Sequence, residues 1–528
     1  MEATSKRDMI WNPPIELSGA EQRIAKRAIS KRKLFVFLRQ HRHLIFDEPF
    51  EQDLIEMYRQ TGAGLPAHPP AMMAMATILQ KYAKVSDNEA VELSCDSKRW
   101  QMVLDNLDSH EPAFSQSVFF DFRMRLMATG MDERILERSA KVARDVGGLS
   151  ERSVRIALDS SPLQGAGRVE DTINLIAHAT RKVIDCVATL TQLSVAQITA
   201  QMGLDLFEAP SIKAALDLDW SDPEQKAGAL DALYQEVEAL QGWLADKMPT
   251  EATKPPLSQT LAVLSHFIEQ DTEPDPAGGR RIKKGVARDR RISVQDQQMR
   301  HGRKSSTKRF DGFKRHIARD IDERLILSVE VTEGNQSDAV ATGFLLEAVQ
   351  EQGRSLTSLH IDRQYLHAPE IKHLDAKGVL IVCRAPGQRN NQEIFTKRDF
   401  KLDMQAMAAT CPAGQKVQIE LGKTVNFPAS VCDKCELRQK CTKRALGKGR
   451  SLAIHEFEPL HQHLEREQST SQGRAALRQR VDVEHSLAHV SQRQGNQARY
   501  TGVRKNLFEL RMVAAIQNLE RAQALLAA

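Results

Sequence analysis

Three acidic residues lie in settings that could bring them to one site. Asp159 lies at the end of an alternating apolar strand expected at 154–161, and Asp362 ends a second apolar strand, 356–361. Glu484 lies on a helix expected late in the chain. Carboxylates that converge repel one another unless divalent cations lie between them, and Mg²⁺ or Mn²⁺ prefers such oxygen ligands. Two such ions, about 3.5–4 Å apart, would activate the attacking oxygen and stabilise the leaving oxygen of a phosphodiester.

Each acid has a simpler interpretation when it is taken alone. An aspartate before Ser160-Ser161-Pro162 is typical of a turn, because proline removes a donor from the sheet and is expected to end the strand there. Glu484 lies four residues after Arg480, on one face of the expected helix 472–492, and would form an ordinary surface ion pair. The shared setting of the three acids, and not any one of them, indicates a metal site.

Basic charge is concentrated in one part of the chain. The 528 residues carry a net charge of only +5, but residues 280–319 hold 15 Lys and Arg against three Asp, a local +12. Such a cluster is typical of a surface that binds phosphates, although a solvated linker would look similar. The residues expected to contact DNA are Arg303, Lys304, Lys308, Arg309, Lys314 and Arg315.

The pattern of apolar residues predicts several units. Strands alternate with helices between 301 and 390, which indicates right-handed crossovers and an α/β sheet whose site lies at the carboxyl ends of its strands. Two strands, 310–320 and 325–331, are expected to form a hairpin, and 271–279 reads as a linker. The expected units are a helical domain (1–150), the first strand of the core (151–171), a helical insertion with a basic linker (172–300), the rest of the core (301–390), a Cys-rich insertion (391–466) and C-terminal helices with the third acid (467–528).

Four of the seven cysteines lie close together in the spacing Cys411-x20-Cys432-x2-Cys435-x5-Cys441. A close pair with two further thiols at loop distances suits a tetrahedral structural Zn²⁺ site. Four free cysteines in a small core are the alternative. No apolar run approaches the length of about 20 residues that spans a membrane, and the first residues lack a signal-peptide pattern. A cytoplasmic, nucleoid-associated protein without a membrane partner is therefore expected.

Several short motifs give the chain a resemblance to a known family, the DDE transposases of bacterial insertion sequences. The three acids stand in Leu158-Asp159-Ser160-Ser161, Ile361-Asp362-Arg363-x-Tyr365 and Arg480-Val481-Asp482-Val483-Glu484. Further similar motifs are Val85-Ser86-Asp87, Phe122-Arg123-x-Arg125-Leu126, His301-Gly302-Arg303-Lys304-Ser305, Phe310-Asp311-Gly312-Phe313-Lys314, Val331-Thr332-Glu333-Gly334-Asn335-x-x-Asp338, Cys411-Pro412-Ala413-Gly414 and Ala498-Arg499-Tyr500-x-Gly502.

The resemblance implies an RNase H-like catalytic core in which Asp159, Asp362 and Glu484 bind two Mg²⁺ or Mn²⁺ ions. Arg480 occupies the arginine of a Tyr-x2-Arg-x3-Glu-x6-Lys signature, whereas the tyrosine and lysine positions hold Leu477 and Ser491.

The implied activity is transposition. The protein would bind the terminal inverted repeats of its element in double-stranded DNA as a homodimer, cleave the ends and join the 3′-OH ends to a target. The alternatives are a nuclease of the same fold without strand transfer, and a DNA-binding protein derived from a transposase that does not catalyse. Asp338 and Asp482, which lie near the motifs, are expected to support the site from behind or to lie on the surface.

Overall fold

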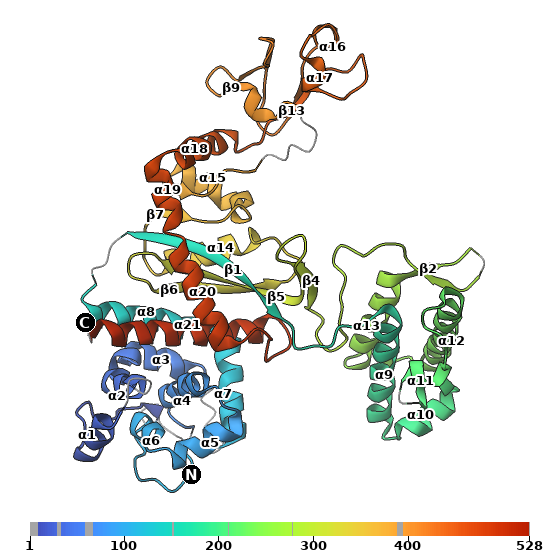
Figure 1. Ribbon diagram of the computed structural model, residues 1–528. Helices are drawn as coiled ribbons and strands as arrows, with labels where there is room; N and C mark the ends of the chain where they lie inside the picture. The colour runs from blue at the N-terminus through green and yellow to red at the C-terminus, as the bar shows by residue number, and fades with distance from the viewer. Residues whose placement is uncertain are drawn as a thin grey trace.

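The computed structural model of the chain describes residues 9–28, 33–58, 67–149, 153–209, 211–276, 278–387 and 394–526. A six-stranded mixed sheet lies at its centre (Figure 1). The central strand β1 pairs antiparallel with β5 on one side and parallel with β7 on the other, and β7 pairs parallel with β8. Both β4 and β6 pair with the far edge of β5, so the expected hairpin is confirmed as β5 and β6. The strands are β1 (Val154–Gln164), β4 (Arg300–Arg303), β5 (Arg309–Asp320), β6 (Ile326–Glu333), β7 (Leu356–His360) and β8 (Leu380–Val382).

Strand β1 does not stop at Pro162, and the expected end at 160–162 is therefore wrong. It continues to Gln164, with Pro162 opposite Lys314 of β5. On its other side, β1 pairs with β7 only as far as Ala157. The later half of β1 is therefore paired on one side only, where a proline is tolerated. Asp159 lies at the start of this half-open stretch, and not at the end of the strand.

The N-terminal helices are confirmed, and they share one hydrophobic core with the sheet. Ser86 and Glu89 form a capping box at the start of α5, and Ser115 caps α7. These caps satisfy backbone N–H groups that the first turn of a helix leaves free. The helices are α1 (Gly19–Lys26), α2 (Lys33–Ile45), α3 (Glu48–Glu56), α4 (Pro70–Ala83), α5 (Asp87–Asp96), α6 (Lys98–Leu104), α7 (Gln116–Thr129) and α8 (Met131–Gly147).

The last helix, α21 (Val503–Leu526), joins the two halves of this core. It lies beside α8 and under the sheet (Figure 1). The fully buried Asp132 of α8 accepts hydrogen bonds from Arg504 and Arg511 of α21. The side chain of Asn518 donates to the carbonyl oxygen of Ile326 in β6 and accepts from its N–H, at 2.8 Å each. The C-terminal helix thus fixes the helical region against the edge of the sheet.

The helical insertion forms a separate bundle to one side of the sheet, with its own core (Figure 1). The segment 271–279, expected as a linker, instead contributes to a short hairpin of β2 (Thr272–Pro274) and β3 (Arg280–Ile282). Its ends are anchored, because Arg280 donates to Thr272 and Arg290 binds the carboxylate of Asp271. No single described helix is long and apolar enough to span a membrane, although α9 and α10, bent by 109°, pass that test as a pair. The helices are α9 (Thr172–Thr191), α10 (Val195–Met202), α11 (Ile212–Leu216), α12 (Pro223–Lys247) and α13 (Leu257–Asp271).

After β8, the chain forms a small module with short strands and a third hydrophobic core. Three of its four clustered cysteines lie on or between two four-residue helices, α16 and α17. The fourth, Cys411, lies earlier in the module. Apart from β7 and β8, the α-helices and strands between β6 and residue 470 are α14 (Val340–Glu351), α15 (Pro369–Ala376), β9 (Lys401–Asp403), β10 (Ala408–Thr410), β11 (Lys416–Gln418), β12 (Thr424–Asn426), α16 (Ala429–Cys432), α17 (Arg438–Cys441), β13 (Ser451–Ala453) and α18 (Glu458–Ser469).

The prediction of one continuous helix at 472–492 is wrong, because the segment forms two helices, α19 (Ser471–Arg478) and α20 (Val481–Gln494). The turn between them is tightened by hydrogen bonds between residues three apart, from Gln479 to Ala476 and from Val483 to Arg480. Two arginines of the sheet hold this turn. Arg155 of β1 donates to the side chain of Gln479, and Arg319 of β5 donates to the carbonyl oxygen of Asp482.

Candidate active site

The register of the sheet places the first two acids side by side. In the parallel pair of β1 and β7, Ala157 lies opposite His360. Asp159 and Asp362 each follow two residues later, so the two acids occupy matching positions on neighbouring strands. The carboxyl ends of parallel strands share one edge of a sheet, where sites commonly form. The adjacency of these two strands, on which a shared metal site depends, is confirmed.

Glu484 reaches the same place from α20, and Arg480 connects it to Asp159. One Nη of Arg480 lies 3.0 Å from the carboxylate of Glu484 and 3.8 Å from that of Asp159. Arg480 and Glu484 are four residues apart across the start of α20, so the turn after α19 aims both side chains at the sheet. The broken helix is therefore what brings the third acid to the first two.

The pKa of Asp159 is raised, as expected for a buried acid beside two other acids and a single arginine. Burial raises the pKa of the Asp159 carboxyl to about 6. The nearby guanidinium of Arg480 lowers the pKa of Asp159, and the charges of Asp362 and Glu484 raise it further. A carboxylate whose ionised form is disfavoured in this way gains most when a cation is added beside it.

All three acids line a groove of about 540 Å³, which we call the acid groove. Arg303 and Lys304, at the end of β4, lie on its rim and are exposed, as the sequence predicts for residues that contact DNA. Lys308 and Arg309 are also exposed, on the same β4–β5 hairpin. The hairpin therefore presents four cations next to the acids.

The side chains of Lys314 and Arg315 bind partners within the fold. Lys314 lines the acid groove, but its ammonium group binds the carboxylate of Asp338 at 2.7 Å. Arg315 is only 1% exposed, and its guanidinium donates to Ser161, Pro162, Gln494 and Gly495. We therefore leave Arg315 out of the proposed DNA contacts. The local +12 overstates the surface charge, because Arg290, Arg300 and Arg319 also bond within the fold.

A buried set of polar residues lies behind the acids, and little in the sequence indicates its importance. Asp338 is 5% exposed and accepts a 2.6 Å hydrogen bond from the hydroxyl of Ser160, the residue after Asp159. The phenol of the buried Tyr365 lies 2.8 Å from a ring nitrogen of His316. Asp338 thus supports the site from behind, which was one of the two expectations for it. The motif Val331-x6-Asp338 was the only sequence signal for this role.

The donor set fits divalent cations, although the acids are not arranged around one as they stand. Within the described ranges, no three His, Cys, Asp or Glu side chains are placed so that they could hold a metal ion. The guanidinium of Arg480 lies between Asp159 and Glu484 and supplies the positive charge there. Three carboxylate donors on one groove are the ligand chemistry of Mg²⁺ and Mn²⁺.

The cysteines also gather at one cavity. Cys411, Cys432, Cys435 and Cys441 line a space of about 40 Å³ in the core of the small module. Burial raises the pKa of the Cys441 thiol, and the other three cysteines contribute in the same direction. The four sulfurs are not placed around one ion as they stand, but four soft sulfur donors at one small cavity are the ligand chemistry of zinc.

Two family models match the chain. A model described as "Transposase domain (DUF772)" matches residues 23–125, and one described as "Transposase DDE domain" matches residues 410–523. Both models describe transposase domains, and they support the assignment of the chain to the DDE transposases of insertion sequences. No curated protein and no solved structure matches it.

The match to the transposase DDE domain contains Glu484, Arg480, the four clustered cysteines and most of α21. Asp159 and Asp362 lie outside the matched range, so their place in this transposase rests on the register of β1 and β7. The family implies a DNA-cleaving enzyme with DNA as its substrate.

Proposed function

We propose that this transposase binds the terminal inverted repeats of its element in double-stranded DNA, cleaves the DNA ends and joins the 3′-OH ends to target DNA. The observation that carries the proposal is the convergence of Asp159, Asp362 and Glu484 on one groove, next to the cations of the β4–β5 hairpin. Acids and cations in this arrangement suit a phosphodiester that is held by one set and cleaved at the other.

In this proposal, Asp159, Asp362 and Glu484 hold two Mg²⁺ or Mn²⁺ ions. Bound there, the ions would activate the attacking oxygen and stabilise the leaving one. Arg303 and Lys304 would bind the phosphates that flank the cleaved bond. Arg480 would bind Glu484 and hold positive charge beside the reacting phosphate. The hydrogen bond from Ser160 to Asp338 would fix the backbone that carries Asp159.

The order of the strands supports an RNase H-like core for the catalytic unit. Strands β1, β5 and β6 form an antiparallel series, and β7 and β8 continue from β1 in parallel. The two strand acids then lie within the first strand, at Asp159, and just after the first parallel strand that follows it, at Asp362. We propose this fold on the strand order and on the position of the acids.

The first test compares the wild type with Asp362→Asn on DNA that carries the element end. We expect the wild type to cleave only with Mg²⁺ or Mn²⁺, and Asp362→Asn to bind the same DNA without cleaving it. Cleavage by Asp362→Asn would contradict the assignment of the acids. Binding without cleavage by the wild type would favour the non-catalytic alternative.

Strand transfer is tested with pre-cut ends. A duplex that already carries a free 3′-OH at the element end should be joined to a plasmid target by the wild type, and paired ends should be joined together if the active form is a homodimer. Hydrolysis of the uncut end without any joined product would identify a nuclease of this fold.

We propose that Cys411, Cys432, Cys435 and Cys441 hold one structural Zn²⁺, in support of the small module and apart from the catalytic ions. The shared cavity of the four sulfurs supports the proposal. Purified protein should contain about one zinc per chain. Protein without zinc, with the same unfolding curve before and after chelation, would favour four free thiols.

A further inference from the structure

A second groove borders two of the three acids, and arginines dominate it. The groove has a volume of about 720 Å³ and is lined by Arg363, Arg384, Arg474, Arg478 and Arg480, and we call it the arginine groove. It shares Asp362, Gln364, Arg480 and Glu484 with the acid groove. Asp362 and Glu484 therefore lie where the two grooves meet.

The fold brings these arginines together from three places. Arg363 follows Asp362 beyond the end of β7, and Arg384 lies two residues beyond the end of β8. Arg474 and Arg478 are four residues apart on α19, so they share one face of this helix. Neighbouring ends of parallel strands and the helix before α20 thus direct their cations into one space. The sequence alone could not indicate this, because 115 positions separate Arg363 from Arg478.

The charge of the arginine groove is not balanced within the chain. In the part of the chain that the structure describes, no carboxylate forms an ion pair with Arg363, Arg384, Arg474 or Arg478, and all four side chains belong to exposed residues. Arg480 is paired, but its Nη1 is buried and has no hydrogen-bond partner among the described residues. A buried donor of this kind costs about 1–3 kcal/mol unless something binds it.

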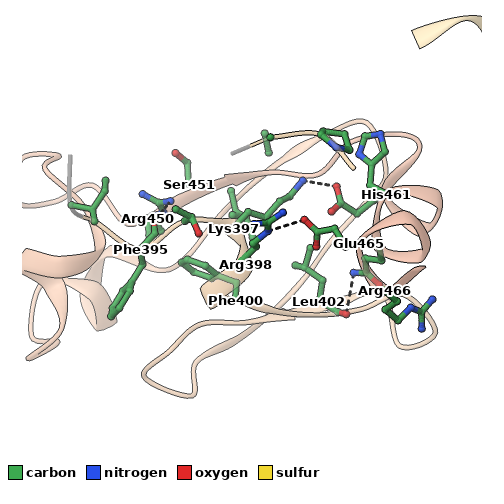
Figure 2. Close-up of a pocket in the computed structure, with 18 of the residues that line it drawn as sticks. Phe395, Lys397, Arg398, Phe400, Leu402, Arg450, Ser451, His461, Glu465 and Arg466 are labelled. Carbon is green, nitrogen blue, oxygen red and sulfur yellow. Dashed lines mark hydrogen bonds and ion pairs between the residues drawn. The ribbon is translucent and has the colours of Figure 1, made fainter. Parts of the chain in front are cut away.

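A neighbouring pocket provides a contrast to the arginine groove, because two of its basic side chains are paired with acids. The pocket of Figure 2 lies between residues 394–402 and α18, and it also contains basic side chains. There, Lys397 binds Glu458, and Arg398 lies 2.9 Å from Glu465. Cations that are paired in this way hold the small module to α18. Unpaired arginines in a groove that leads to the acids are instead suited to an external anion.

We propose that the arginine groove binds the phosphodiester backbone of the DNA on one side of the cleaved bond, while Arg303 and Lys304 bind it on the other side. This inference rests on the proposed function and adds residues that it does not contain. A DNA strand that crosses the junction of the two grooves would place one phosphate at the acids and the next ones among the arginines. Arginine binds phosphate oxygens in pairs, and a groove of one charge sign raises the local concentration of a polyanion. These contacts position DNA and carry no base specificity.

The test measures binding by the full chain in EDTA, where no cleavage is expected, to duplexes of the element end that are shortened stepwise from either side of the cleavage point. The variant Arg474→Gln with Arg478→Gln removes two cations and keeps the helix face polar. The matched control, Arg23→Gln with Arg27→Gln, removes the same charge at the same spacing from the exposed side of α1 and its C-terminal cap.

We expect the groove variant to lower the slope of log affinity against log salt by roughly 1.5–2 on the long duplex, since each lost phosphate contact removes about 0.7–0.9. Between 50 and 200 mM salt, the affinity of the wild type should therefore fall roughly tenfold further than the affinity of the groove variant. On duplexes shortened from one particular side, the same variant should bind like the wild type. The control should change all duplexes equally or not at all.

If the groove variant lost the same affinity for every duplex, or lost affinity for none, the inference would be overturned while the proposed function stayed in place. If the wild type neither bound nor cleaved element ends, the proposed function would fail first. Arg363→Gln with Arg384→Gln provides a second pair at the strand ends, in case the α19 variant is poorly folded, and it should lose affinity for the same side of the duplex.

Discussion

Replacing Asp159 by asparagine should stabilise the metal-free protein while it abolishes cleavage. Burial raises the pKa of this carboxyl from 3.8 to about 6, so its ionised form is disfavoured in the folded state. Because its pKa is raised, this carboxyl contributes most to the free energy of unfolding below pH 3.8. Its contribution falls as the pH rises from 3.8 to about 6 and stays low above that pH. Two pKa units correspond to about 3 kcal/mol. Asparagine has the same shape without the charge, but it removes the attraction of Arg480, which lies 3.8 Å away. We therefore expect a net gain of about 1–3 kcal/mol at pH 8.

Urea unfolding in EDTA, followed at pH 8 and at pH 4, measures this effect. Asp159→Asn should unfold at higher urea than the wild type at pH 8, and the difference should shrink to a small part of that value at pH 4, where the wild-type carboxyl is protonated in the folded state and partly protonated in the unfolded state. Mg²⁺ or Mn²⁺ should narrow the difference at pH 8, because an ion at ten times its Kd adds about 1.4 kcal/mol to the stability of the protein that binds it. A variant no more stable than the wild type at pH 8 in EDTA, or a difference that does not depend on pH, would refute the electrostatic account of the site.

Four other substitutions test separate parts of the structure. Asp338→Asn should leave DNA affinity unchanged and lower the cleavage rate about 10–100-fold, because Ser160 and Lys314 lose a charged partner; an equal loss of affinity would contradict a positioning role. Arg315→Ala should lower the urea midpoint, since it breaks four hydrogen bonds of a buried guanidinium, whereas Arg303→Ala should weaken DNA binding at an unchanged midpoint. Cys435→Ser should release zinc and promote proteolysis within 394–453 while the core stays folded; retained zinc would exclude this cysteine as a ligand.

Local patterns were sufficient for much of the fold. Helical periodicity and capping residues predicted about half of the helices of the N-terminal region, and alternation predicted the hairpin of β5 and β6. The parallel pairing of β7 with β8 followed from the order of strands and helices. These features depend on interactions between near neighbours or on general rules of topology.

What the sequence did not predict depends on tertiary contacts. The break between α19 and α20 has no glycine or proline to mark it, and arginines of β1 and β5 hold the turn. Pro162 remains within β1 because only one side of the strand is paired there. Arg315 has the same charge as Arg303, yet only the register of β5 directs it into the fold. The arginine groove, likewise, collects residues from separate elements.

The position of α21 at the centre of the molecule determines when the site can form during synthesis. A ribosome that has completed β1, β5 and β7 has made two of the three acids, but the core that supports them still lacks its last helix. Because α21 contacts both α8 and β6, the N-terminal helices and the sheet can complete their shared core only after residue 526 has been added. Folding therefore waits for contacts between residues far apart in sequence, which makes it slow. A chain released before α21 would lack the core that supports the acids, so the proposed cleavage of DNA requires a chain that includes α21.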